Sequence, residues 1–238
     1  MMRAVCVLCL VLCLITELTK AQSYSQDTLF VVAAEANGKK IYSGAIRNQS
    51  QLYNGTDFKV YQSLKDEHPF LFSDDWITGT VQYDGNIYED VPIQYDIQND
   101  EVIIEYYNGI RSIRLIKPKV QYFTLERDKF VMLTDPQLST GFYQVLYDGQ
   151  TKVYARHSKT LQETISGREI QHSFTERTKY YVFSKGSYHL ITGKGAVLDV
   201  FKDKKKELNQ FAKKNKLGFR KNKAAYITQL ADYYDNHQ

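Results

Sequence analysis

The most informative stretch for the fold is WITGTVQYDGNIYEDVPIQYDIQNDEVIIEYYNGIRSIRL, residues 76–115. It contains two short turn signals, Asp84-Gly85 and Asn108-Gly109, and the segments around them alternate in polarity or are rich in β-branched residues. Such pairs favour hairpin turns, because these residues tolerate the positive φ angles that primed turns require. The pattern predicts an antiparallel meander.

The segment 87–97 alternates most regularly within this stretch. Its apolar side carries Val91, Ile93, Tyr95 and Ile97, and its polar side carries Gln94, Asp96 and Gln98. Side chains alternate between the two faces of a strand. The alternation predicts a sheet with one face on a core and the other facing water.

Further strand patterns continue toward the C-terminus and end in a helical segment. Residues His157–Gly167 are polar and aperiodic, which predicts a flexible connection or lid. From Gly195 the apolar residues recur at helical spacing, Gly218 ends a first helix and Asn222 is the expected N-cap of a second. The predicted fold class is α+β and mostly β: an extended, curved antiparallel meander sheet with a C-terminal two-helix hairpin packed on it.

The N-terminus predicts export. Arg3 is followed by an unbroken apolar run of twelve residues, 4–15. A signal peptide needs roughly 7–15 apolar residues and a membrane-spanning helix about 20. Small residues at Thr19 and Ala21 predict cleavage after Ala21, with an uncleaved anchor as the alternative. The expected domains are a signal peptide of residues 1–21, a β domain of residues 22–193 and a basic helical hairpin of residues 194–238.

All three cysteines, Cys6, Cys9 and Cys13, lie in the apolar run, so the expected mature chain has none. This excludes disulfides, thiolate metal sites and cysteine nucleophiles from the mature chain. An exported chain without cystine favours the periplasm or cell surface of a Gram-negative bacterium. A lipoprotein modified at Cys13 is the alternative, although Leu10–Leu12 lacks the small residue that such processing favours.

Positive charge is concentrated near the C-terminus. Lys194–Lys223 has eleven basic and three acidic residues, whereas the whole chain carries a net charge of only +4. Such a basic helix face attracts anionic headgroups or polysaccharide. We therefore expect an anionic surface or an envelope protein as the partner, and no nucleic acid; the alternative is a solvated face that only keeps the helix soluble. The candidate binding residues are Lys204, Lys205, Lys206, Lys213 and Lys214.

Few residue patterns point to chemistry. The five histidines show no metal-ligand spacing, so no metal and no cofactor is expected, and no catalytic residue is assigned. Asp74 and Asp75 precede Trp76, the only tryptophan. A glycosidase needs two carboxylates, and aromatic rings can bind a sugar beside them. Trp76 is therefore a further candidate binding residue, although carboxylates at such a turn also serve as caps.

Several turns and core positions form a recognisable set. The motifs are Tyr83-Asp84-Gly85, Tyr88, Val91-Pro92, Tyr95-Asp96, and Phe-Tyr-x-x-Leu-Tyr-x-Gly at Phe142–Gly149. Together with the lysine-rich helix and a second helix closing in Tyr-Tyr, they resemble a family of secreted β-rich proteins of Bacteroidetes. The resemblance covers nearly the whole mature chain, and it implies the compartment and the architecture without implying an activity or a site.

Three functions are consistent with these patterns. The favoured hypothesis is a non-enzymatic exported envelope protein that acts by binding or assembly. The second is a carrier of an apolar, lipid-like ligand enclosed by the curved sheet. The third is a glycan-active hydrolase that uses the carboxylates around Asp74, with Trp76 on the wall of its cleft.

Overall fold

The computed structural model describes residues 51–59, 67–166 and 169–237, together with residues 30, 31, 34 and 38. The chain divides into two compact units, residues 1–50 and 51–238, and the second contains the sheet and helices described below. The expected signal peptide of residues 1–21, its cleavage after Ala21 and the alternative modification of Cys13 lie outside the described residues.

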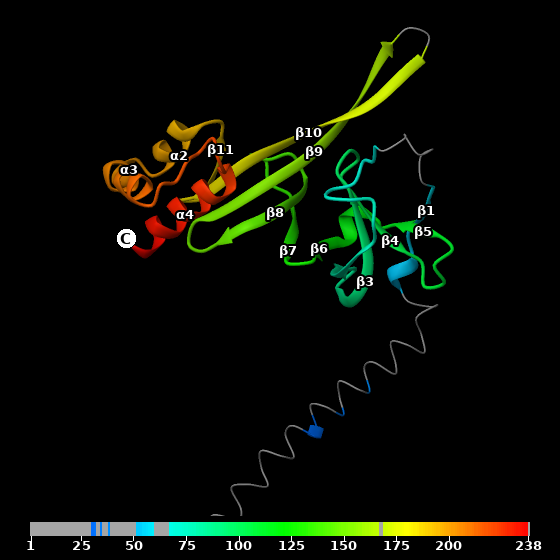
Figure 1. Cartoon of the computed structure of the whole chain (residues 1–238). Coiled ribbons are helices and arrows are strands. Elements are labelled where there is room, and N and C mark those ends of the chain that lie inside the picture. Colours follow the sequence, from blue (N-terminus) through cyan, green and yellow to red (C-terminus); the bar gives the residue numbers. More distant parts are fainter. Residues whose placement is uncertain are drawn as a thin grey trace, which may run out of the picture. The chain divides into compact units, whose positions relative to one another are not determined.

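One antiparallel sheet dominates the second unit (Figure 1). Among the described residues it has eleven strands, in the order β1-β5-β4-β3-β2-β6-β7-β8-β9-β10-β11. The prediction of a mostly β meander is confirmed. The strands are β1 (Thr56–Phe58), β2 (Ile77–Tyr83), β3 (Asn86–Asp96), β4 (Glu101–Glu105), β5 (Ser112–Arg114), β6 (Val120–Leu125), β7 (Asp128–Leu133), β8 (Gly141–Asp148), β9 (Lys152–Ser166), β10 (Glu169–Ser184) and β11 (Ser187–Ile191).

The turn signals lie where the sequence placed them. Asp84 and Gly85 join β2 to β3 and both have positive φ angles, 51° and 84°. Gly109, with a φ of 69°, lies in the connection from β4 to β5. Positive φ is inexpensive for glycine and tolerated by aspartate, so these residues allow the chain to reverse without strain.

The sheet curls around a first core made of its own side chains. Tyr95 of β3 lies 5.1 Å from Phe123 of β6, 5.4 Å from Phe130 of β7 and 5.9 Å from Phe142 of β8, measured between ring centroids. Three strands separate β3 from β8 in the sheet. Since neighbouring strands lie about 4.8 Å apart, a flat sheet would hold Tyr95 and Phe142 about 19 Å apart. The predicted curvature is therefore present and strong.

The polar side of β3 differs from the prediction. Val91, Ile93, Tyr95 and Ile97 are buried as expected, but Gln94 and Asp96 are also buried rather than facing water. The segment before β2 covers them: the Gln94 side chain donates to the backbone oxygen of Asp74, and Phe70 forms an isolated bridge with Asp96. Periodicity shows which face is apolar, but it does not show what covers the other face.

The prediction of a flexible connection or lid at His157–Gly167 is wrong for residues 157–166, which belong to β9. β9 and β10 pair without interruption, from Lys152 opposite Phe183 to Ser166 opposite Glu169. β8 pairs with β9 only as far as Ala155, and β11 pairs with β10 only from Tyr180. Residues 157–166 and 169–178, here called the ribbon, form a two-stranded extension of about 30 Å (Figure 1). Threonines and single apolar residues suit such an exposed ribbon, which has too weak an apolar periodicity to be recognised as strand.

Helices cover the other end of the sheet and form a second core. They are α2 (Lys194–Val200), the short 3-10 helix η4 (Lys202–Lys204), α3 (Lys205–Lys214) and α4 (Lys223–Asn236). The predicted first helix is thus interrupted at Phe201, whose ring is fully buried and packs on Tyr234 with ring centroids 4.5 Å apart. Asn222 caps α4 as predicted, since its side chain accepts from the backbone N–H of Ala225.

Candidate functional site

The predicted lysines lie on a helix that is anchored by its opposite side. Leu208 and Ala212 of α3 are buried in the second core. At 100° per residue, Lys206, Lys213 and Lys214 lie on the side of α3 away from Leu208. All three are exposed. The core packing therefore holds these three lysines on one outward face.

Two of the predicted lysines contribute less to this face. Lys204 ends η4 and is half-buried. Lys205 is exposed, but its Nζ lies 2.8 Å from Oδ1 of Asp199, so its charge is partly neutralised within the chain. The exposed, unneutralised charge on the outward face of α3 therefore comes from Lys206, Lys213 and Lys214 and less from Lys204 and Lys205.

Lys213 and Lys214 also belong to a larger group of cations. Sequence reasoning counted this group within the basic segment Lys194–Lys223 but did not name Arg220, Lys221 and Lys223 as candidates. Between Leu208 and Ala231 the chain has six basic residues and no acidic one. All six are exposed, and within the described residues no carboxylate lies close enough to pair with any of them. We call them the cationic turn because they occupy the end of α3, the α3–α4 connection and the start of α4: Lys213, Lys214, Lys216, Arg220, Lys221 and Lys223.

The charges of the cationic turn do not all favour helix stability. Lys213 and Lys214 lie in the last turn of α3, where the helix dipole favours cations. Lys221 and Lys223 flank the start of α4, where the dipole disfavours them, and the first turn of α4 has no acidic residue. Helix stability therefore does not account for the positive charge at the start of α4.

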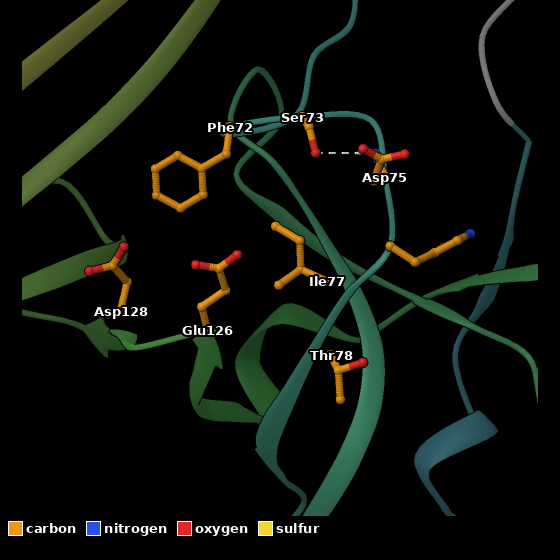
Figure 2. A pocket seen from close by; sticks show the side chains of 8 residues that line it. Phe72, Ser73, Asp75, Ile77, Thr78, Glu126 and Asp128 are labelled. Atoms are coloured by element: carbon orange, nitrogen blue, oxygen red, sulfur yellow. Dashed lines mark hydrogen bonds between the residues drawn. The ribbon is translucent and has the colours of Figure 1, made fainter.

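Trp76 lies in a different part of the molecule. It is half-buried and packs against a small cluster formed by Phe58, Phe70 and Ile103. Trp76 also lines a hollow of about 620 Å³ together with Phe72, Ser73, Asp75, Ile77, Thr78, Glu126 and Asp128 (Figure 2). Trp76 and the lysines of α3 therefore belong to separate surfaces.

The hollow has two aromatic side chains, Phe72 and Trp76, and three carboxylates on its walls. The Phe72 side chain, 56% exposed, points toward Glu126 and Asp128 (Figure 2). The backbone N–H of Ser73 donates to the oxygen of Leu71, which makes a three-residue turn around Phe72 with φ of 67°. This turn is uncommon for a bulky residue and holds the ring out toward solvent. Of the two aspartates before Trp76, Asp75 lines the hollow and Asp74 does not.

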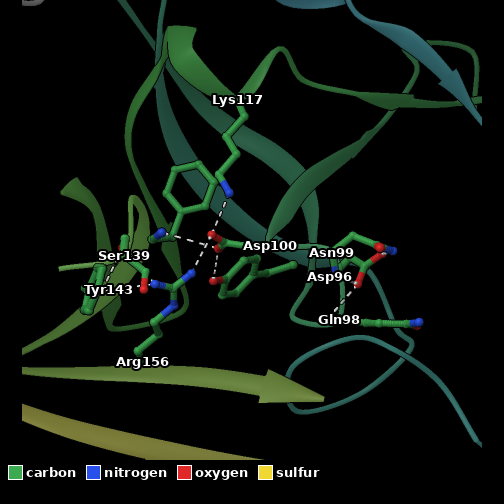
Figure 3. A network of polar contacts seen from close by, with 10 residues as sticks. Asp96, Gln98, Asn99, Asp100, Lys117, Ser139, Tyr143 and Arg156 are labelled. Atoms are coloured by element: carbon green, nitrogen blue, oxygen red, sulfur yellow. Dashed lines mark hydrogen bonds and ion pairs between the residues drawn. The ribbon is translucent and has the colours of Figure 1, made fainter. Parts of the chain in front are cut away.

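A polar network fastens the curled sheet (Figure 3). Asp100, in the β3–β4 turn, accepts hydrogen bonds from the Tyr95 hydroxyl at 2.7 Å and from Lys117 Nζ at 2.6 Å. Its carboxylate also lies 3.5 Å from Arg156 of β9. Burial, and next the nearby Asp100 charge, raise the pKa of the Tyr95 hydroxyl well above its ordinary value. The network therefore has a structural role, joining the β3–β4 turn to β9.

The inner face of the sheet does not support the apolar-ligand carrier. In the described part of the chain this face is filled by packed side chains such as Phe123, Phe130 and Phe142, whose rings lie about one ring diameter apart. The hollow beside Trp76 and a second one beside Lys185 and Asp203 both lie outside this core. A buried lipid tail would need space that these rings occupy.

Metal binding also lacks a preformed arrangement in the described residues, where no three His, Cys, Asp or Glu side chains are grouped to hold an ion. Of the helices that the structure describes, none has the length and apolar character needed to cross a membrane. No protein-family model, curated protein or solved structure matches the chain.

Proposed function

We propose that the protein is an exported, non-enzymatic binding protein of the cell envelope that attaches to an anionic lipid surface through the cationic turn and the outward face of α3. The observation that carries the proposal is the run of six exposed cations without an acidic residue. Export is supported by the apolar N-terminal run, and the envelope location by the resemblance to secreted Bacteroidetes proteins.

The physical basis of binding is electrostatic attraction by a fixed group of charges. Leu208, Leu230 and Tyr234 anchor α3 and α4 in the second core, so the backbone that carries the lysines is already held in place before binding. Each cation held near an anionic membrane contributes about 1 kcal/mol, and salt weakens the attraction within about one Debye length. Six cations can therefore hold the protein on an anionic bilayer without any helix entering it.

Vesicle binding at increasing salt concentration tests the proposal. The purified protein is expected to cosediment with vesicles that contain phosphatidylglycerol, to release from them as salt rises, and to ignore pure phosphatidylcholine vesicles. The variant Lys213→Gln/Lys214→Gln should lose roughly 30-fold in affinity, from about 1 kcal/mol per lysine.

A matched variant separates local charge from net charge. Arg127→Gln/Lys179→Gln removes two exposed cations from the sheet and changes the net charge equally. It should bind like the unmodified protein. Equal losses in both variants, or no preference for anionic vesicles, would contradict the proposal. Binding to a sulfated polysaccharide but not to vesicles would replace the lipid surface with a glycan.

The hollow next to Trp76 supports a second candidate function, a glycan-active hydrolase. Its walls carry more than the two carboxylates that glycan cleavage uses, and the exposed ring beside them can stack on a sugar. Release of reducing ends from a polysaccharide by the purified protein, abolished by Glu126→Gln and retained by Glu89→Gln, would establish this activity and overturn the non-enzymatic proposal. Absence of release across polysaccharide classes would leave the binding function.

A further inference from the structure

The hollow beside Trp76 carries negative charge that the described part of the chain does not neutralise. None of the eight residues that line it is basic, and three are carboxylates: Asp75, Glu126 and Asp128. Among the described residues, no ion pair joins any of these three to a cation. Lys129, which follows Asp128, places its Nζ 4.9 Å from the ring centroid of Tyr122 instead. The hollow therefore attracts a cation and repels an anion.

The Phe72 ring adds a second attraction for positive charge. Leu71, the residue before it, is 3% exposed, whereas Phe72 is 56% exposed and points toward Glu126 and Asp128 (Figure 2). The face of an aromatic ring attracts a cation that lies within about 6 Å of its centroid. Several described lysines and arginines lie over aromatic rings in this way, but none of them lies over Phe72. The ring is therefore available to a cation from outside the chain.

The size of the hollow and its apolar walls favour an organic cation over a metal ion. Its volume of about 620 Å³ falls within the range of roughly 300–1,000 Å³ that is usual for small-molecule sites. In the part of the chain that the structure describes, its carboxylates are not grouped closely enough to hold a metal ion. Phe72 and Ile77 supply apolar surface, which suits the methyl or methylene groups around an ammonium nitrogen.

We propose that this hollow binds a small organic ammonium cation, with the charged group between the Phe72 ring and the carboxylates of Glu126 and Asp128. The proposal is independent of attachment to an anionic lipid surface, because the hollow and the cationic turn are separate surfaces. It also assigns the hollow a ligand other than a sugar, since a neutral sugar leaves the charge of the carboxylates unused. The ligand is a free cation and not a zwitterionic lipid headgroup, because three carboxylates repel the phosphate of such a headgroup.

Titration with choline and two matched compounds tests the charge of the ligand. Trp76 lines the hollow and is the only tryptophan, so its fluorescence reports binding to the purified full-length protein. Choline should bind saturably. The neutral isostere 3,3-dimethylbutan-1-ol has the same shape without the charge and should bind roughly tenfold more weakly or worse. Phosphocholine should also bind more weakly than choline. Equal binding of either compound, or no saturable binding of choline, would overturn the proposal.

Two variants test the groups that are expected to touch the cation. Phe72→Leu keeps an apolar side chain but removes the ring, and should weaken choline binding roughly 2- to 30-fold. Glu126→Gln removes one charge and should weaken it roughly 2- to 5-fold. Glu89→Gln, at an exposed position of β3, is the matched control and should bind like the unmodified protein. Unchanged affinity in Phe72→Leu or Glu126→Gln, with circular dichroism showing a folded protein, would contradict the proposal.

Discussion

The two hydrophobic cores of the sheet are covered in different ways. The first is lined by strands β2–β8, whose aromatic rings meet because the sheet curls, with Leu52 and Leu71 closing it. In the second, Val153, Val182 and Ile191 are the buried strand residues, and residues of α2, α3 and α4 and their connections supply the remainder. A sheet face can thus be buried by curvature or by helices, and this chain uses one solution at each end.

The boundary between the cores is polar. Along β8, Phe142 belongs to the first core and Leu146 packs against the second, with buried Gln144 between them. The Gln144 Oε1 lies 2.7 Å from Nε2 of His157, whose Nδ1 lies 3.1 Å from the Thr178 hydroxyl. These hydrogen bonds satisfy the polar groups where apolar packing ends. With a polar boundary between them, the two cores can unfold either together or separately.

Removing the central ring of the first core should have the largest effect. Phe123→Ala deletes a fully buried side chain that contacts Tyr95, Phe130 and Phe142, and we expect the free energy of unfolding to fall by about 3–5 kcal/mol. Urea unfolding is followed by fluorescence of Trp76, which lies in the β region, and by helical circular dichroism. Coincident transitions would show one cooperative unit, whereas a shift of the fluorescence transition alone would show that the cores are independent.

The corresponding change in the second core should be equal or slightly smaller. Leu230 of α4 is fully buried against the sheet, so Leu230→Ala is expected to cost about 2–5 kcal/mol. The exposed neighbour Gln229, changed to alanine, provides the control and should alter stability little. If Leu230→Ala shifts only the circular dichroism transition, the helices are a separate unit attached to a stable curled sheet.

Loss of charge in the network that fastens the curl should have an intermediate effect. Asp100→Asn keeps the size of the side chain and its tolerance of the positive φ of 59°, but weakens the bonds to Lys117 and Arg156. We expect a loss of about 1–3 kcal/mol in urea unfolding. Glu89→Gln, at an exposed position of β3, should be neutral. A neutral Asp100→Asn would show that packing of the rings alone holds the sheet curled.

The smallest effect should appear at the polar boundary and depend on pH. Burial lowers the pKa of His157 from its ordinary value of 6.5, so the folded state holds a neutral imidazole. Below about pH 6.5 the unfolded state binds a proton at this histidine more readily than the folded state does. The free energy of unfolding therefore decreases as pH falls. His157→Gln should therefore lose less stability than the unmodified protein between pH 7.5 and 5.5, measured by urea unfolding. An identical pH dependence would contradict the assignment.

The candidate surfaces were only partly predictable. The lysines of the first predicted helix were identified from their spacing. Arg220, Lys221 and Lys223 were counted in the basic segment Lys194–Lys223 but were not chosen as candidates, because they lie outside the predicted helix. The aromatic and acidic hollow was anticipated through Trp76 and its neighbouring aspartates. Glu126 and Asp128 were missed, since they come from the β6–β7 turn and the start of β7, far away in the sequence.

Local structure could be predicted from the amino-acid sequence, because the Asx-Gly turns, the alternation of β3, the helical period after Gly195 and the cap at Asn222 depend on neighbouring residues. Other features depend on contacts between distant segments. The curl depends on contacts between Tyr95 and Phe142, the cover over Gln94 comes from Asp74, and the break at Phe201 follows from its packing on Tyr234. Such choices depend on free energies of packing between distant segments, which periodicity along the chain does not contain.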